Sequence, residues 1–137
     1  MKVTGLNGRE YNLNVSKYNR KRTGSKLHEC ARDLLKELFP MYLLLEEVPL
    51  LGSKDPTSSA TKTLVADFLI PELKIIIEVQ GRQHKEYVPH FHKTKANFFR
   101  ARRRDNLKRE WCELNEFTLI ELDHDDKDWR KTIGENT

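Results

Sequence analysis

The feature that most constrains this chain is Ile75-Ile76-Ile77, an unbroken apolar run within the segment Leu73–Val79. A continuous β-branched run of this kind is typical of a strand that is buried on both faces. We therefore expect this segment to lie at the centre of a sheet, and Gly81 to end it. A chain of 137 residues is long enough for one such core and too short for two.

Three further segments predict strands around this central one. A turn at Pro71-Glu72 joins the nearest of them directly to the apolar run. The polar stretch Gly52–Thr63 reads as a loop between two of the strands. The three predicted strands are Leu43–Leu50, Leu64–Ile70 and Phe117–Leu122.

Helical periodicity frames the strands on both sides. Ser25 suits the N-cap of a first helix, which Pro40 ends. A long second helix is predicted over Ala96–Asn115, and Trp129 falls in one further helical turn. The inward positions predicted for the first helix are Leu27, Ala31, Leu34, Leu35 and Leu38, and those for the second are Phe98, Phe99, Leu107, Trp111 and Leu114.

The predicted order of elements is α-β-β-β-α-β. Its first three strands can form an antiparallel meander, and the last strand returns after a helical crossover. This pattern predicts the α/β class, with a mixed central sheet of about four strands flanked by helices. We expect residues 25–137 to form this single domain and residues 1–24, with a short hairpin around Asn7-Gly8, to form a basic N-terminal arm.

Basic residues gather in two segments, although the net charge is only +4. Residues 1–26 hold seven Lys or Arg against Glu10, and residues 93–109 hold eight against Asp105. Two basic segments of this kind are typical of a protein that binds a polyanion, and solvated faces are the alternative.

Composition disfavours several other classes of protein. No stretch approaches the ~18 apolar residues of a membrane span, and no signal peptide opens the chain, so we expect an intracellular, cytoplasmic protein. Cys30 and Cys112 lie in predicted helices, where buried free thiols are expected. With His90 and His92 they lack the close spacing of a zinc site, which disfavours structural zinc.

Two acidic residues interrupt the predicted inner strands. Asp67 and Glu78 stand among aliphatic neighbours, where a carboxylate is costly unless a metal or a cation pairs with it. Gln80 shares a face with Glu78, and His84 follows in a predicted loop, where an imidazole can take a proton from water. Carboxylates on adjacent strands of a hairpin can converge to hold Mg²⁺.

The stretch from Ala66 to His84 resembles the core of the PD-(D/E)xK nuclease superfamily. More narrowly, it is similar to the branch of very-short-patch-repair endonucleases and of homing endonucleases with an EDxHD motif. The resemblance runs from about Ser25 to Leu122. It implies a restriction-endonuclease-like fold and hydrolysis of DNA phosphodiester bonds, with Mg²⁺ as the cofactor and Mn²⁺ as a substitute.

The resemblance assigns a role to each matching residue. Asp67 matches the metal-binding Asp, and Glu78 and Gln80 match the E-x-K pair, with Gln in place of Lys. The carbonyl of Val79 is a further candidate metal ligand. Because Gln80 carries no charge, the resemblance makes His84 the general base. Asp105 matches the final Asp of the motif and would orient His84 or Lys108, although an ordinary helix salt bridge to Lys108 is the alternative.

The first helix departs from the family pattern. Helical phase puts His28 where the family has a Glu, and Glu29 lies about 100° further round the helix. Either His28 replaces the acid, or the helix is shifted in register and Glu29 serves.

Double-stranded DNA is the expected partner, and a homodimer would serve a long target site. Candidate DNA-binding residues come from the arm, the histidine-rich loop and the second long helix. They are Arg20, Lys21, Arg22, Lys85, His90, His92, Lys93, Arg100, Arg103, Arg104 and Lys108.

Within the superfamily, the resemblance favours a site-specific homing-type enzyme of a phage or mobile element. The alternatives are a structure-specific nuclease, such as a Holliday-junction resolvase or mismatch nickase, and a non-catalytic DNA-binding module.

Overall fold

Two sheets and three α-helices make up the part of the chain described by the computed structural model, which covers residues 1–21, 24–55, 62–80 and 95–137. The elements are β1 (Lys2–Thr4), β2 (Glu10–Asn12), the 3₁₀ helix η1 (Val15–Tyr18), α1 (Lys26–Leu38), β3 (Leu45–Pro49), β4 (Val65–Ile70), β5 (Ile75–Gln80), α3 (Lys95–Leu114), β6 (Thr118–Asp123) and α4 (Trp129–Glu135).

The larger sheet has four strands in the order β3-β4-β5-β6. The β3–β4 and β4–β5 pairs are antiparallel, whereas β5 and β6 are parallel. This arrangement follows from the connections: a tight turn joins β4 to β5, whereas β6 follows the long helix α3. The predicted α/β class with a mixed four-stranded sheet is therefore confirmed, and the Ile75–Ile77 run lies in an inner strand.

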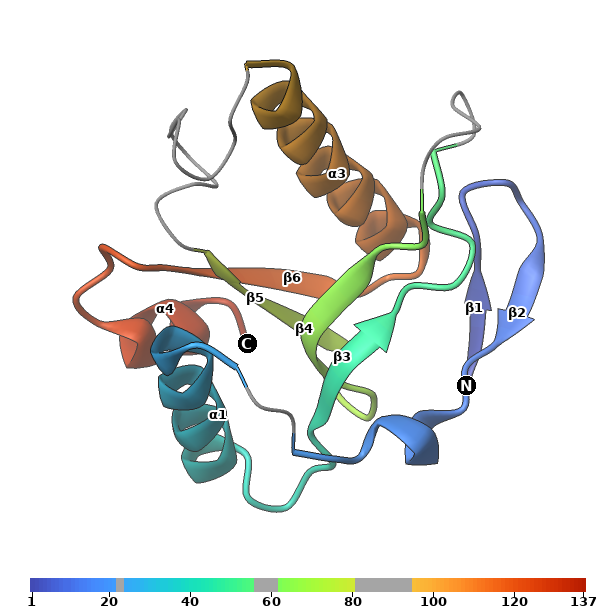
Figure 1. The fold of residues 1–137 in the computed structure, drawn as a ribbon. Coiled ribbons are helices and arrows are strands. Elements are labelled where there is room, and N and C mark those ends of the chain that lie inside the picture. Colours follow the sequence, from blue (N-terminus) through green and yellow to red (C-terminus); the bar gives the residue numbers. More distant parts are fainter. Residues whose placement is uncertain (22–23, 56–61, 81–94) are drawn as a thin grey trace.

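Helices cover the two faces of this sheet (Figure 1). α3 lies on one face, and α1 and α4 lie together on the other. Each face carries its own apolar cluster. Leu107 and Trp111 of α3 pack with Leu69 and Ile76, and Ala31 and Leu35 of α1 belong to the opposite cluster with other sheet residues.

The first helix begins as predicted, because the Ser25 side chain accepts a hydrogen bond from the backbone N–H of His28 at 3.2 Å. Its buried face differs in part from the predicted one. Ala31 and Leu35 are buried, but so are the polar side chains of His28 and Arg32. The buried stripe therefore includes two residues that can carry charge, which hydrophobic periodicity alone does not predict.

The prediction for α3 was wrong at two positions. Leu107 and Trp111 are buried as expected, whereas Phe99 is 65% exposed and Leu114 is 49% exposed. Phe99 lies in the first part of the helix, which extends past the edge of the sheet (Figure 1), and Leu114 is the last residue of the helix. Cys112 is buried, but Cys30 is exposed, contrary to the expectation of two buried thiols.

The N-terminal segment forms the hairpin that Asn7-Gly8 predicted. β1 and β2 pair in antiparallel fashion, and Gly8 adopts a φ of 81°, which favours glycine. Val3 and Leu13 are each only 3% exposed and belong to the core cluster on the α3 side. This hairpin therefore packs onto the core, which its polar composition did not indicate.

Candidate active site

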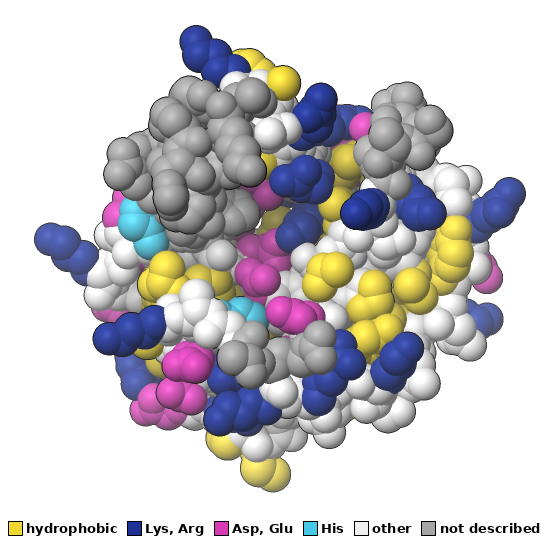
Figure 2. All heavy atoms as spheres, in the orientation of Figure 1, with side chains coloured by type: hydrophobic (Ala, Val, Ile, Leu, Met, Phe, Trp, Pro, Cys, Tyr) yellow, Lys and Arg dark blue, Asp and Glu magenta, His cyan; other side chains and the backbone are white. Residues whose placement is uncertain are grey.

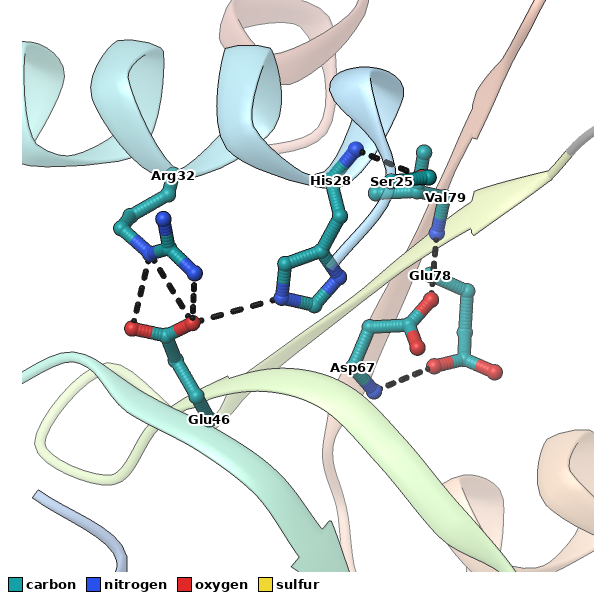
Figure 3. Close-up of polar contacts among 7 residues, drawn as sticks. All are labelled: Ser25, His28, Arg32, Glu46, Asp67, Glu78 and Val79. Carbon is teal, nitrogen blue, oxygen red and sulfur yellow. Dashed lines mark hydrogen bonds and ion pairs between the residues drawn. The ribbon is translucent and has the colours of Figure 1, made fainter. Parts of the chain in front are cut away.

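Asp67 on β4 and Glu78 on β5 lie opposite each other on neighbouring strands (Figure 3). Strand pairing between β4 and β5 runs out to Phe68 and Ile77, and the two acids occupy the next position outward. At this position, hydrogen bonds from backbone N–H groups to the two carboxylates replace the backbone–backbone hydrogen bonds between the strands. The N–H of Asp67 donates to Glu78 Oε2 at 2.7 Å, and the N–H of Val79 donates to Asp67 Oδ2 at 2.9 Å. The sequence-based prediction that these carboxylates converge therefore agrees with the geometry.

Glu78 is the more buried of the two acids, with 6% of its surface exposed. Its Oε1 forms an ion pair with Nζ of Lys108, which α3 brings over the sheet. Burial raises the pKa of the Glu78 carboxyl to about 7; the charge of Lys108 opposes this rise, and the charge of Asp67 adds to it. A carboxyl with this pKa exchanges its proton near neutral pH.

Lys108 was expected to contact DNA, and its contact with Glu78 was not foreseen. Gln80, which the sequence resemblance aligns with the Lys of the E-x-K pair, is buried at the end of β5. The cation beside Glu78 comes instead from a helix thirty residues later in the chain. No local spacing signals this contact, because it depends on how α3 crosses the sheet.

Several predicted residues lie outside the described part of the chain. These are His84, the candidate general base, and the candidate DNA contacts Arg22, Lys85, His90, His92 and Lys93. Val79, whose carbonyl was a candidate metal ligand, is half-buried in β5 between Glu78 and Gln80.

The remaining predicted residues of α3 differ in burial and in their partners. Asp105 is half-buried and lies three residues before Lys108 on the same helix. Arg100 and Arg104 are exposed, as a DNA-facing surface requires. The Arg103 side chain is held by a hydrogen bond, because its Nε donates to Oδ2 of the buried Asp55 at 3.2 Å.

On the first helix, only one of the two alternatives faces the sheet. His28 is buried, its ring stacks on Phe68 with centroids 4.4 Å apart, and its Nε2 lies 3.3 Å from Glu46 Oε1. Glu29 is exposed and does not contribute to this interior. Because Phe68 directly follows Asp67, His28 lies beside the strand that carries the first acid.

Glu46 and Arg32 are buried functional candidates that sequence reasoning missed. Each is only 2% exposed, and Arg32 Nε donates to both carboxylate oxygens of Glu46 at 3.0 Å. The Glu46 carboxylate raises the pKa of the Arg32 guanidinium. A signal was present, because Arg32 follows His28 by one helical turn and so shares its inward face. Figure 3 shows His28 between this ion pair and the Asp67–Glu78 pair.

Figure 2 shows a face of the molecule on which acidic and basic side chains lie close together. Acidic side chains gather at its centre beside a shallow hollow, and Lys and Arg side chains lie above and to the right of them. A negative centre attracts a cation, whereas the basic surroundings attract a polyanion. The two attractions together suit a metal-assisted reaction on a phosphate backbone.

Asp67 and Glu78 fit a hard divalent cation in the chemistry of their donors. An ionised carboxylate offers about four lone-pair sites, so each can accept its backbone N–H and still bind an ion. Within residues 1–21, 24–55, 62–80 and 95–137, three or more His, Cys, Asp or Glu side chains nowhere gather as a metal-binding group. The two carboxylates are oxygen donors of the kind that Mg²⁺ takes in proteins, where water and substrate phosphate fill its other positions.

Comparison with known proteins gives one distant relative. Uncharacterized protein 307L of Invertebrate iridescent virus 6 is 41% identical to this chain over 78 residues. The match covers 55% of this chain and 40% of the viral protein, so the chain spans less than half the length of that relative. No protein family profile and no solved structure matches the chain. In the part of the chain that is described, no helix is long and apolar enough to cross a membrane.

Proposed function

We propose that this protein is a Mg²⁺-dependent DNA endonuclease that hydrolyses phosphodiester bonds. The observation that carries the proposal is the convergence of Asp67 and Glu78 at one end of β4 and β5, with Lys108 of α3 against Glu78. Two carboxylates and one cation on rigid elements are the parts that phosphodiester hydrolysis needs. The restriction-endonuclease-like fold remains part of this proposal, supported by the mixed sheet with helices on both faces.

Lys108 supplies the positive charge that Gln80 lacks. In the hydrolysis of a phosphodiester, negative charge accumulates on the phosphate oxygens, and a fixed ammonium group stabilises it. Lys108 is held near the reacting centre by Glu78, so its position is set before substrate binds. His84 therefore need not compensate for the missing charge, and its proposed role is limited to accepting the proton of the attacking water.

Asp67 and Glu78, with the carbonyl of Val79, would hold Mg²⁺, and Mn²⁺ would substitute for it. The bound ion would polarise the phosphate and lower the pKa of the attacking water. Gln80 would orient the water or the phosphate by hydrogen bonding. Arg100, Arg104 and the basic N-terminal segment would hold the DNA backbone, because phosphate contacts position a duplex without reading its sequence.

Site-specific cleavage of the homing-endonuclease type is the proposed mode of action. The sequence resemblance supports it, and the viral source of the relative agrees with a protein of a mobile or parasitic genome. One domain of this size can read only a short site, so a homodimer is proposed for a longer target. A cytoplasmic site of action remains a prediction.

The decisive experiment measures cleavage of supercoiled plasmid with Mg²⁺ and with EDTA. Asp67→Asn keeps an oxygen that can accept the Val79 N–H but removes the charge. We expect it to cut at least about 10²–10³-fold more slowly than the parent, and Asp67→Ala to be as slow or slower. Lys131→Ala, an exposed lysine of α4 outside the two basic segments, serves as the control and should cut at the parent rate. Parent protein that never cuts, or variants that cut equally well, would refute the proposal.

A second candidate function is a non-catalytic DNA-binding module on the same fold. The ion pair between Lys108 and Glu78 favours it, because this contact already satisfies the buried carboxylate without a metal. The two candidates separate on calorimetry with Mg²⁺ or Mn²⁺: the enzyme binds the ion through Asp67, whereas the module does not. A structure-specific nuclease is distinguished by faster cutting of a synthetic four-way junction than of linear duplex.

A further inference from the structure

A pocket of about 390 Å³ lies between the N-terminal segment and the end of α1. Its volume falls within the range of about 300–1,000 Å³ that is typical of small-ligand sites. The chain after η1 forms one wall, and the loop from α1 to β3 forms the other; Figure 1 shows these segments side by side at the base of the molecule. None of the acids proposed for catalysis lines it.

The polar wall of the pocket is basic. Arg20, Lys21 and Lys36 line it, and among the described lining residues Glu46 alone is acidic. The charge of Glu46 is already balanced by Arg32, with oxygen–nitrogen distances of 2.9–3.0 Å. Arg20, Lys21 and Lys36 therefore give this wall three positive charges, and the guanidinium of Arg20 also lies 5.2 Å from the centroid of the Tyr18 ring. The Nε of Arg20 is buried and has no hydrogen-bond acceptor within the described residues, so an anion would satisfy a donor that the described fold does not.

The other wall is apolar and aromatic. Phe39 and Tyr42 meet edge to face, with centroids 6.5 Å apart, and Tyr42 is 40% exposed. Pro40, Leu43 and Leu44 complete this wall. An exposed aromatic ring beside clustered cations is the arrangement by which proteins bind single-stranded nucleic acid, because bases stack on the ring while phosphates meet the charges.

We propose that this pocket holds one unpaired nucleotide of the DNA substrate. Its phosphate would lie against Arg20, Lys21 and Lys36, and its base against Tyr42. The proposal rests on the proposed function only in taking DNA as the ligand. It adds to the proposed duplex substrate a preference for DNA with an unpaired or displaced nucleotide, since a base inside a duplex cannot reach the ring without leaving its stack.

Contacts link the pocket to Phe68, the residue that follows Asp67 in β4. Glu46 lines the pocket and lies 3.3 Å from His28, whose ring stacks on Phe68 beside Asp67. A strand held in the pocket would thus lie against residues that also contact β4, the strand that carries Asp67. This gives the pocket a place in substrate positioning and none in the chemical step.

Binding is measured by fluorescence anisotropy in EDTA, with Asp67→Asn as the background so that nothing is cut. The probes are a labelled duplex and the same duplex with one extra unpaired nucleotide. We expect the second to bind about tenfold more tightly, the scale of one base stacked on an aromatic ring. Tyr42→Ala should abolish this preference and leave affinity for the paired duplex unchanged.

Four further variants complete the test, and three of them are controls: Tyr42→Phe, Met41→Ala and Lys26→Ala. Tyr42→Phe keeps the ring and should keep the preference, and Met41→Ala removes the exposed neighbouring side chain, which lies outside the pocket, without effect. Lys36→Ala should weaken binding of the unpaired probe more than Lys26→Ala, since Lys26 is an exposed lysine of the same helix outside the pocket.

Equal affinity for the two duplexes, or a preference that survives Tyr42→Ala, would overturn the proposal. So would displacement of the unpaired probe by a phosphoserine peptide as readily as by a mononucleotide, because the base would then add nothing. A preference for the unpaired probe in a parent protein that never cuts DNA would uphold the pocket and reject the nuclease. Cutting without the preference would do the reverse.

Discussion

Glu46 and Glu78 are both buried glutamates on strands of one sheet, yet they are held in opposite ways. Both carboxylate oxygens of Glu46 accept hydrogen bonds from Arg32, and Nε2 of His28 lies 3.3 Å from one of them. Glu78 receives one lysine and one backbone N–H, and burial raises the pKa of its carboxyl to about 7. Arginine is charged at any ordinary pH and binds a carboxylate in a fixed, two-pronged geometry. Glu46 is therefore held in its charged form by a fixed structural ion pair. Glu78 can instead give up its contact with Lys108, or its proton, and bind another partner.

The largest effect is expected when the ion pair between Arg32 and Glu46 is broken. Arg32→Met leaves the Glu46 carboxylate buried without its main partner, which should lower the free energy of unfolding by about 3–5 kcal/mol. Urea denaturation followed by circular dichroism measures the change. The double variant Arg32→Met/Glu46→Met should recover much of the loss, since no buried charge then remains. If Arg32→Met alone is as stable as the parent, Glu46 is not held by this ion pair and the contrast fails.

Lys108→Ala should separate the two glutamates by function. It removes the cation beside Glu78 and should slow plasmid cleavage by about 10²–10³-fold, the scale of one lost electrostatic donor at a reacting centre. Stability should change much less than in Arg32→Met, because a Glu78 left alone can take up a proton. Lys131→Ala, on the exposed surface of α4, is again the control. Unchanged cleavage in Lys108→Ala would remove the lysine from the mechanism.

The pH dependence of stability should report Glu78. Its folded pKa of about 7 lies above the ordinary value of 4.5, so the native state holds a proton that the unfolded chain releases. The stability that this protonation adds is fully present below about pH 4.5. It is lost as the pH rises from there through about 7. In EDTA the parent should lose up to about 3 kcal/mol between pH 5 and 8, and Glu78→Gln should lose less. Parallel profiles for the two proteins would show that Glu78 is already ionised when buried.

An exposed ion pair gives the smallest effect and the baseline for the others. Arg109 and Glu121 meet at 2.8 Å on the surface, where the arginine is half exposed. Arg109→Ala should cost about 0.2–1 kcal/mol in unfolding free energy, and less in high salt. A loss as large as that of Arg32→Met would mean that burial does not explain the difference between the pairs.

The sequence predicted those parts of the site that depend on neighbouring segments. Asp67 and Glu78 flank one tight turn, so pairing of their strands brings them together, and the Ile75–Ile77 run identified the inner strand. The position of Lys108 depends on the angle and height at which α3 crosses the sheet. That crossing is set by packing of side chains such as Trp111 and Leu107, which periodicity does not specify.

Burial of charge was likewise beyond the reach of local patterns. Helical phase turned His28 inward, but the acid it meets lies on β3 and the arginine beside it reads as an ordinary surface residue. Such a residue is buried only because all three side chains satisfy one another. The hairpin of β1 and β2 was predicted from its turn. Its packing was not, because Val3 and Leu13 are isolated buried apolar side chains in a segment that is otherwise mostly polar.

The exchange of hydrogen bonds between Asp67 and Glu78 makes two backbone amides into reporters of the site. The N–H groups of Asp67 and Val79 are shielded only while the opposing carboxylates face them. A cation or a phosphate that draws either carboxylate away should expose these amides to solvent exchange, while the amides further along β5 stay protected. Occupancy of the site can therefore be followed in an uncut complex by isotope exchange at two positions, without any label on the nucleic acid.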